Sequence, residues 1–374
     1  MYERAEARVD LEALSHNCRL LKSRLAPGVE LCPVLKADGY GHGALHCVST
    51  VARSGADRIA VATAREGVQV RSILPDVPLL VLGALAPGEI EMAVSARTDV
   101  AAWDPAFIVS LATQAAAIEG QIGVHVKYDT GMGRLGSTDP EQVLEMARSV
   151  AAKPNLRLEA VWTHFATADE EDTAFRDRQR DRLAALGERA RAELPGVRLH
   201  AANSAAMIAD PATHFDLVRP GVAIYGMDPF GRDPAEHGLR PVLSFHSYVA
   251  SVKEFEPGMS AGYGRTWTAA APTRVATVPV GYGDGVRRSL SNRGEVLING
   301  RRHPIVGTVS MDNITVDLGP EAPVQVGDEV TLIGAQGGAE IRTEEIAGWL
   351  ETINYEVTCG LSPRVPRIGV NEPR

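Results

Sequence analysis

The chain has 374 residues, of which 45% are hydrophobic and 23% charged, so it has enough apolar material for a sizeable core. Its net charge of −9 argues against a general nucleic-acid binder, which would carry a basic excess. The four cysteines form neither a C-x-x-C pair nor a cluster with zinc spacing, so we expect no disulfide scaffold and no metal centre.

The start of the chain gives no targeting signal. Met1-Tyr2-Glu3-Arg4 is charged and no apolar stretch follows it, which predicts no signal peptide. The longest apolar run, Val77 to Ala86, is far shorter than the ~20 residues needed to span a bilayer. We therefore expect a cytoplasmic protein with no membrane partner. A helix is predicted over Asp10–Leu25, with Asp10 as its cap.

The next two hundred residues alternate short aliphatic runs with segments of helical length. The runs read as buried parallel strands, over Glu30–Leu35, Arg58–Ala62, Pro78–Leu82, Asp99–Ala102, Gly123–Tyr128, Leu156–Thr163, Arg198–Ala202 and Asp216–Arg219. Helices are expected between them, for example over Ala44–Arg53, Pro105–Ala117, Pro140–Ala151 and Thr173–Glu193. Eight such units predict an α/β fold of the (β/α)8 barrel type. The rival, a doubly wound dinucleotide-binding sheet, lacks a G-x-G-x-x-G after an early strand.

The pattern changes near Pro241, where shorter strands separated by turns begin. Strands are expected over Leu243–Val252, Arg274–Val280, Gly294–Ile298, Ile305–Val309, Ile314–Leu318 and Asp328–Ile333. We therefore predict a barrel over residues 1–240 and a mainly β domain over residues 241–374. The first ten residues or so are candidates for the second domain, and we interpret that domain as all-β.

Reactive groups in such a barrel belong at the carboxyl ends of the strands. Lys36 follows an apolar strand, and loss of solvation there would lower its pKa and make its amine nucleophilic. Ser204 begins a helix after the seventh strand, and the amides of Gly221 and Val222 follow the eighth, which together favour an anion site. A reactive lysine beside a phosphate cradle, without a Walker loop, indicates pyridoxal 5'-phosphate (PLP).

Several longer motifs resemble those of bacterial alanine racemases, in order and over nearly the whole chain. They are Val34-Leu-Lys-Ala-Asp-Gly-Tyr-Gly-His-Gly43, Lys127-Tyr-Asp-Thr-Gly-Met-Gly-Arg-Leu-Gly136, Asn203-Ser204, Arg219-Pro-Gly221, Ala261-Gly-Tyr-Gly-Arg265, Gly281-Tyr-Gly-Asp-Gly285 and Gly307-Thr-Val-Ser-Met-Asp312. The resemblance implies a PLP-dependent racemase that interconverts L- and D-alanine, supplies D-alanine for peptidoglycan, and works as a head-to-tail homodimer.

The resemblance also implies two bases on opposite faces of PLP. Lys36 would bind the cofactor covalently and serve as one base, and Tyr263 of the partner subunit would serve as the other. A tyrosine has a reference pKa of ~10, and a hydrogen-bond chain through His164 to Arg219 would ease its ionisation.

Arg219 would face the ring nitrogen of PLP. A guanidinium only donates hydrogen bonds, so the ring nitrogen must accept one and stay unprotonated. The cofactor then becomes a weaker electron sink, which favours simple proton return over transamination. Most other PLP enzymes place an acid there.

The remaining roles also come from the resemblance. Arg134 and the amide of Met311 would bind the substrate carboxylate, and a carbamylated Lys127 would position Arg134, although the sequence is equally compatible with an unmodified Lys127 paired with a nearby acid. Cofactor contacts would come from Tyr40, His164, Asn203, Ser204, Gly221, Val222 and Tyr355. Tyr282 matches an aromatic residue at the entrance of the active site, and Asp312 lies near the chemistry without an assigned role.

Three alternatives differ from alanine racemase in testable ways. A racemase of serine or basic amino acids is the nearest, although such relatives are typically exported. A decarboxylase of similar architecture would present an acid to the ring nitrogen, where this chain offers Arg219. A non-catalytic PLP carrier would be a single barrel, without the β domain that holds Tyr263.

Overall fold

The computed structural model describes residues 3–373, so part of the segment behind the signal-peptide prediction, Met1 and Tyr2, lies outside it. The chain forms two compact units. The barrel unit holds Ser15–Tyr40 and Cys47–Ile224. The β unit holds the start of the chain up to Leu14, the short stretch Gly41–His46, and the chain from Tyr225 onward.

The barrel unit contains one parallel sheet of eight strands, in the order β2-β9-β8-β7-β6-β5-β4-β3. The strands are β2 (Glu30–Leu31), β3 (Ile59–Val61), β4 (Leu79–Val81), β5 (Asp99–Ala102), β6 (Ile122–Lys127), β7 (Leu156–Trp162), β8 (Arg198–His200) and β9 (Leu217–Val218). A parallel bridge between Val34 and Ala60 joins the two ends of this order and closes the sheet. The predicted (β/α)8 barrel is therefore confirmed.

The barrel strands are apolar because both of their faces are covered. Every residue of β3, β4, β5 and β6 is buried. Strand β5 is confirmed to the residue and β6 has its predicted length, whereas the other strands are shorter than predicted, most of all the first, where Glu30–Leu35 reduces to two residues. Pro33 has no N–H to give to a ladder, and beyond it only Val34 makes a bridge.

Helices follow the strands and begin at recognisable caps. Asp104 and Asp139 accept backbone N–H bonds at the starts of α6 and α7, and Pro105 and Pro140 occupy the first turns. The barrel-unit helices are α2 (Lys36–Tyr40), α4 (Ala64–Ile73), α5 (Pro87–Ser95), α6 (Pro105–Ala117), α7 (Pro140–Ala151), α8 (Ala174–Glu193) and α9 (Ser204–Ala209), with short helices η1 (Pro211–Thr213) and η2 (Val222–Tyr225).

Two α-helices begin in one unit and end in the other, and the short helix η2 also ends in the β unit, at Tyr225. The two α-helices are α1 (Leu11–Ser23) and α3 (Ala44–Arg53). The predictions for α3, α6 and α7 are confirmed to the residue. The first predicted helix is shorter than Asp10–Leu25, but Asp10 does cap it, accepting a 2.8 Å hydrogen bond from the Ala13 amide.

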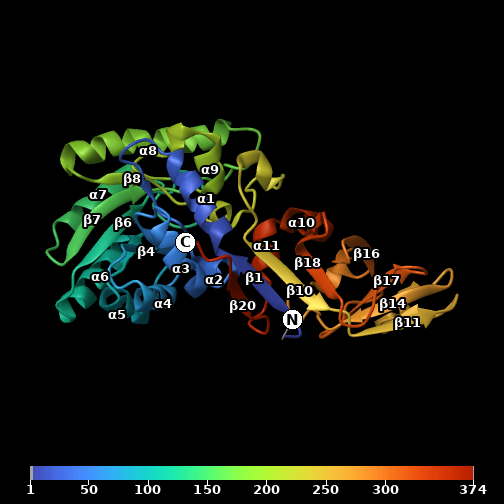
Figure 1. Cartoon of the computed structure of the whole chain (residues 1–374). Coiled ribbons are helices and arrows are strands. Elements are labelled where there is room, and N and C mark those ends of the chain that lie inside the picture. The colour runs from blue at the N-terminus through green and yellow to red at the C-terminus, as the bar shows by residue number, and fades with distance from the viewer. Residues whose placement is uncertain (1–2, 374) are drawn as a thin grey trace. The chain divides into compact units, whose positions relative to one another are not determined.

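The β unit is built on a ten-stranded sheet of mostly antiparallel strands. Its strands are β1 (Glu6–Asp10), β10 (Leu243–Tyr248), β11 (Ser251–Phe255), β14 (Thr273–Val278), β15 (Glu295–Ile298), β16 (Arg301–Val306), β17 (Ile314–Gly319), β18 (Glu329–Gln336), β19 (Ala339–Ile341) and β20 (Arg367–Val370). A separate pair is formed by β12 (Ser260–Ala261) and β13 (Trp267–Thr268). Figure 1 shows blue β1 between yellow β10 and red β20, so both ends of the chain contribute to one sheet.

The predicted mainly β character of the second domain is confirmed, but its interpretation as all-β was wrong. Two helices, α10 (Thr343–Leu350) and α11 (Asn354–Cys359), follow the sheet, with short helices η3 (Pro234–His237), η4 (Tyr263–Arg265) and η5 (Arg288–Leu290) before them. Ile346, Ala347 and Val357 pack into the core of this unit, which explains why these helices form. The predicted strand Leu243–Val252 is also broken, into β10 and β11. Among the residues that the structure describes, no helix is long and apolar enough to cross a membrane.

Candidate active site

The barrel unit gathers polar and charged side chains just beyond the carboxyl ends of its strands. Lys36 follows the first strand, Lys127 ends β6, and His164, Ser204 and Arg219 come after β7, β8 and β9. Arg219 Nη2 lies 3.1 Å from His164 Nδ1, and the charges of Arg219, Lys127, Arg134 and Lys36 all lower the pKa of His164. Tyr263, Tyr282, Met311 and Tyr355 belong to the β unit, so this grouping consists of barrel residues.

The segment after Lys36 has an unusual backbone. Ala37, Asp38, Gly39 and Tyr40 all have positive φ, at 52°, 53°, 64° and 53°. Non-glycine residues in this left-handed region cost roughly 1–2 kcal/mol each. The turn is held by the Gly39 amide, which donates to Leu35 O at 3.0 Å, and by the Ala37 amide, which donates to Glu66 at 2.8 Å. Its effect is to fold Tyr40 back, with its ring 5.8 Å from Lys36 Nζ.

The chain after β8 and β9 forms a cradle that fits a phosphate. Ser204 Oγ accepts hydrogen bonds from the amides of Gly221 at 3.0 Å and Ala223 at 3.3 Å. Both lone pairs of the hydroxyl are thus used, so its proton points to an acceptor outside this pair. In the described part of the chain, the Val222 amide has no acceptor. A Cβ on Gly221 would lie 2.2 Å from Tyr40 Oη, so glycine lets that hydroxyl approach the cradle.

Asn203 has a structural role that its sequence position did not reveal. Its side-chain oxygen accepts a 3.0 Å hydrogen bond from the Ala206 amide and caps α9. The side chain therefore fixes the start of the helix that carries Ser204. This contact does not test the predicted contact of Asn203 with the cofactor.

Arg219 is a buried cation whose protein partners are all neutral acceptors. Its guanidinium donates to His200 Nδ1 at 2.6 Å, His164 Nδ1 at 3.1 Å, and the carbonyls of Ala201 and Thr163 at 2.9 and 3.0 Å. Burial, aided by the charge of Arg134, lowers the pKa of Arg219 to about 10, which still leaves it protonated at neutral pH. Its Nε–H has no acceptor among the described residues, so it is available to a ligand acceptor.

His164 is held as a neutral ring. Burial, together with the neighbouring cations, holds the pKa of His164 well below its usual range. Because Arg219 can only donate, Nδ1 of His164 is the acceptor and its proton lies on Nε2. That Nε2–H is the group through which His164 can act on a further residue.

The Lys127 amine is buried against the ring of Trp162 and has no polar partner among the described residues. Its Nζ lies 3.5 Å from the ring centre of Trp162 and, within residues 3–373, makes no hydrogen bond. Burial and the charges of Arg219 and Arg134 hold the pKa of Lys127 well below its usual range. Burial therefore favours the neutral, nucleophilic form of this amine.

The loop between Lys127 and Arg134 folds around one carboxylate. Asp129 accepts hydrogen bonds from the amides of Gly131 at 2.9 Å, Gly133 at 3.1 Å and Arg134 at 3.1 Å. Although burial opposes its ionisation, these amides hold the pKa of Asp129 below its ordinary value. The Arg134 side chain is exposed at the end of this loop, where a carboxylate can reach it.

The predicted residues of the β unit lie on joined loops. Tyr263 stands in η4 with 74% of its surface exposed, and Thr308 donates to its carbonyl. The Tyr282 amide donates to Ser310 O at 3.0 Å and the Gly283 amide to Met311 O at 2.9 Å, so the 281–285 and 307–312 motifs are tied together. The Met311 amide has no acceptor in the described chain.

Ion pairs give Asp312 a structural role that the sequence left open. Arg364 pairs with Asp312 at 2.7 Å and with the buried carboxylate of Asp284 at 3.5 Å. Arg4 also pairs with Asp284. These pairs bind the two loops together beside Met311, and no motif had marked Arg4 or Arg364.

A second polar group in the barrel was also missed. Asp99, His125 and Glu159 place one ligand atom each within 4.8 Å of one another, as metal ligands would. However, Arg58 pairs with Asp99 and lies 3.7 Å from Glu159, and Arg157 pairs with Asp99 at 3.2 Å. Their charges already balance the two carboxylates. The sequence feature that could have revealed this polar group is His125, a histidine within the otherwise apolar strand β6.

Acid should destabilise the protein below neutral pH because several histidines are buried in neutral form. Burial lowers the pKa of His125, His164, His200, His246 and His303. In the unfolded chain these rings take up protons near pH 6.5, and in the folded chain they do so only at lower pH. The free energy of unfolding should therefore fall as pH drops below ~6.5, by up to ~1.4 kcal/mol per pH unit for each ring. Urea titrations at pH 7.5, 6.5 and 5.5 measure this slope, and equal stability at all three would contradict the assignment.

Comparison with known proteins places these features in a family. Residues 9–229 match the model of the alanine racemase N-terminal domain, and residues 242–369 that of the C-terminal domain. The alanine racemase of Symbiobacterium thermophilum is 44% identical over 96% of both chains. That of a Nostoc species is 39% identical over 98% of this chain and 96% of its own.

Solved structures agree with these sequence matches. The alanine racemase of Streptomyces coelicolor A3(2) superposes with a TM-score of 0.92 at 36% identity, over 98% of both chains. An alanine racemase from Bacillus anthracis with bound L-Ala-P does so with a TM-score of 0.91 at 34% identity, over 100% of this chain and 97% of its own.

Proposed function

The chain belongs to the alanine racemase family, and we propose that it interconverts L-alanine and D-alanine with PLP bound at the barrel site. The observation that carries this proposal is Arg219, a buried guanidinium whose Nε–H is left for a ligand and whose partners are neutral. A decarboxylase of this architecture would need an acid at that place.

The barrel residues fit PLP. Lys36 would bind it covalently, Arg219 would donate to its ring nitrogen, and Ser204, Val222 and Tyr40 would donate to its phosphate, with Gly221 leaving room for Tyr40. His164, Asn203 and Tyr355 complete the proposed set. When bound, PLP supplies an electron sink that makes the α-hydrogen of an attached amino acid acidic.

Two bases then invert the α-carbon. Lys36 takes or returns a proton on one face and Tyr263 on the other, so inversion requires both. Neutral His164, with its proton on Nε2, can donate toward the Tyr263 oxygen and favour its ionisation. Arg134 and the free Met311 amide would bind the substrate carboxylate, while Tyr282 lines the entrance.

We further propose a homodimer in which Tyr263 acts in the partner's site. In support, Tyr263, Tyr282 and Met311 are large side chains with 74%, 44% and 52% of their surfaces exposed on one unit. Large apolar side chains gathered on joined loops form the kind of exposed patch that a partner can cover. Cys18 and Cys32 are buried free cysteines, which are compatible with a reducing cytoplasm. There the product D-alanine would supply peptidoglycan synthesis.

Lys127 is proposed to carry a carbamate. Its neutral amine would attack CO2 through nitrogen and release one proton, which replaces a buried amine without a partner by an anion beside Arg134 and Arg219. We expect a carbamate resonance after incubation with 13C-bicarbonate, and none in Lys127→Gln. In that variant KM for alanine should rise about 10-fold or more as Arg134 loses a charged partner. Lys153→Gln is the control, and a carbamate that survives Lys127→Gln would contradict the assignment.

The proposed activity is tested directly by isotope exchange. The purified protein with PLP is incubated with L-alanine or L-serine in D2O, and the products are separated by chiral chromatography. We expect D-alanine with deuterium at the α-carbon and little D-serine. Substantial D-serine would point to a broader racemase, and no inverted product from either would contradict alanine racemisation.

A further inference from the structure

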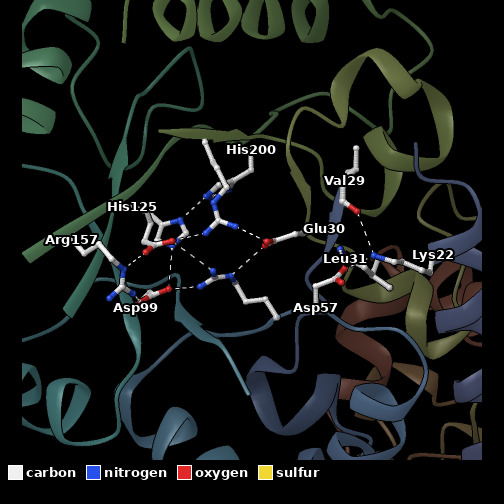
Figure 2. A network of polar contacts seen from close by, with 12 residues as sticks. Lys22, Val29, Glu30, Leu31, Asp57, Asp99, His125, Arg157 and His200 are labelled. Atoms are coloured by element: carbon white, nitrogen blue, oxygen red, sulfur yellow. Dashed lines mark hydrogen bonds and ion pairs between the residues drawn. The ribbon is translucent and has the colours of Figure 1, made fainter. Parts of the chain in front are cut away.

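A line of buried polar groups leads from Arg219 into the interior of the barrel. Arg219 Nη1 lies 2.6 Å from His200 Nδ1, and His200 Nε2 lies 2.8 Å from His125 Nδ1. His125 Nε2 then lies 3.7 Å from a carboxylate oxygen of Asp99. Figure 2 shows His200, His125 and Asp99 in this order. None of the family motifs in the sequence contains His125, His200 or Asp99.

The line runs along the barrel from one end of the strands to the other. Arg219 follows β9 and His200 is the last residue of β8, whereas Asp99 is the first residue of β5. Both histidine rings are completely buried. At the far end of the line, Arg58 and Arg157 form ion pairs with the Asp99 carboxylate.

Elementary hydrogen-bond rules fix the direction of every contact. A guanidinium cannot accept, so Nδ1 of His200 accepts and the single proton of its neutral ring is on Nε2. That proton can only be donated to Nδ1 of His125, so the proton of His125 is on Nε2 and faces Asp99. The reverse direction would leave one ring without a proton.

The buried positive charge of Arg219 explains what this line of polar groups does. Arg219 is a buried cation, and its direct partners are two histidines and two carbonyls with no negative charge. Asp99 is ionised, since despite burial its contacts with His125 and with arginines lower its pKa to about 2. At 3.7 Å from Asp99, His125 Nε2 makes no hydrogen bond to the carboxylate, but the negative charge attracts its N–H and polarises the two linked rings, which makes His200 Nδ1 a better acceptor for Arg219.

We propose that His125 and Asp99 are positioning residues, which act through His200 to hold the Arg219 guanidinium in one orientation. This proposal rests on the proposed function in one respect, namely that Arg219 faces the ring nitrogen of the cofactor. The orientation of Arg219 would then control how much of a side reaction accompanies racemisation. A loosely held Arg219 would allow more of the side reaction in which the amino group of alanine passes to the cofactor and pyruvate leaves, with water providing the carbonyl oxygen.

The direction of the chain is tested first on the full-length protein, by 15N NMR of histidine-labelled samples with and without PLP. We expect His125 and His200 both to be neutral with the proton on Nε2 in either sample. A proton on Nδ1 of either ring, or a charged ring at neutral pH, would overturn the proposal. Because this measurement does not need catalysis, it stands apart from any failure of the proposed activity.

The positioning role is tested with His125→Phe, which keeps a ring of similar size and removes both contacts. We expect pyruvate formed per racemisation event to rise about 10-fold, equivalent to ~1.4 kcal/mol between the two barriers. Asp99→Asn keeps an oxygen facing His125 and removes the negative charge, so it should act in the same direction, more weakly. If both variants fold and pyruvate formation stays at the wild-type ratio, the proposal is wrong.

His214→Phe provides the matched control. His214 is also buried in the barrel unit, where it donates to Met207 O at 2.9 Å, and it has no contact with Arg219. Its replacement should cost similar stability and leave the ratio of pyruvate to racemisation unchanged. An equal rise in His214→Phe would show that loss of packing alone produces the effect, and would overturn the positioning role.

Discussion

Tyr263→Phe should lower racemisation by about 10²–10⁴-fold while PLP remains bound. The phenol oxygen is the only atom removed, and Tyr263 is so exposed on its own unit that its loss should not disturb the fold. Lys36 would still serve one face of the substrate. One enantiomer of alanine should therefore continue to exchange its α-hydrogen in D2O, while the other exchanges far more slowly.

This asymmetry separates a lost base from a damaged site. A general loss of binding would slow exchange of both enantiomers and raise KM for both. Tyr248→Phe, at the end of β10, removes the same atom elsewhere in the β unit and should leave both rates unchanged. Interconversion of both enantiomers by Tyr263→Phe at near wild-type rates would remove Tyr263 from the two-base assignment.

The barrel was predictable from sequence because parallel strands covered on both faces are apolar throughout. Their alternation with capped helices gave α6 and α7 to the residue, since Asp-Pro marks both starts. The fold of the β unit was harder to predict from the sequence. Strands β1 and β20 come from opposite ends of the chain, and nothing local shows that Glu6–Asp10 pairs with both β10 and β20. Helices α10 and α11 were missed because the prediction for this region was based on its turns and the strands between them.

The candidate site was predictable where residues close together in one sequence motif also lie close together in the structure. Lys36 and Tyr40 are drawn together by a left-handed turn within one motif, and Ser204 begins the helix after β8 while Gly221 follows β9. Residues that act through others were not predictable. His125 and Asp99 lie on different strands, and only the barrel brings His125 within reach of both Asp99 and His200. Arg364 likewise reaches Asp312 from fifty-two positions away.

Lys36→Ala should abolish covalent binding of PLP and lower racemisation at least ~10,000-fold, because one residue is both the attachment point and a base. The chain has five lysines, Lys22, Lys36, Lys127, Lys153 and Lys253, so borohydride reduction followed by peptide mapping can identify the modified one without ambiguity. We expect cofactor on Lys36 alone in the wild type, none in Lys36→Ala, and full activity in the control Lys253→Ala.

Lys127 is the competing amine, and its surroundings explain why it should not be the attachment point. Its nitrogen is buried and lies 3.5 Å from the ring centre of Trp162, which covers it. Lys36 is only half-buried and shares its left-handed turn with Tyr40, whose hydroxyl reaches the phosphate cradle at Gly221. A cofactor whose phosphate sits in that cradle would therefore meet Lys36. Reductive labelling of Lys127 would contradict this division between the two amines, and with it the roles proposed for both lysines.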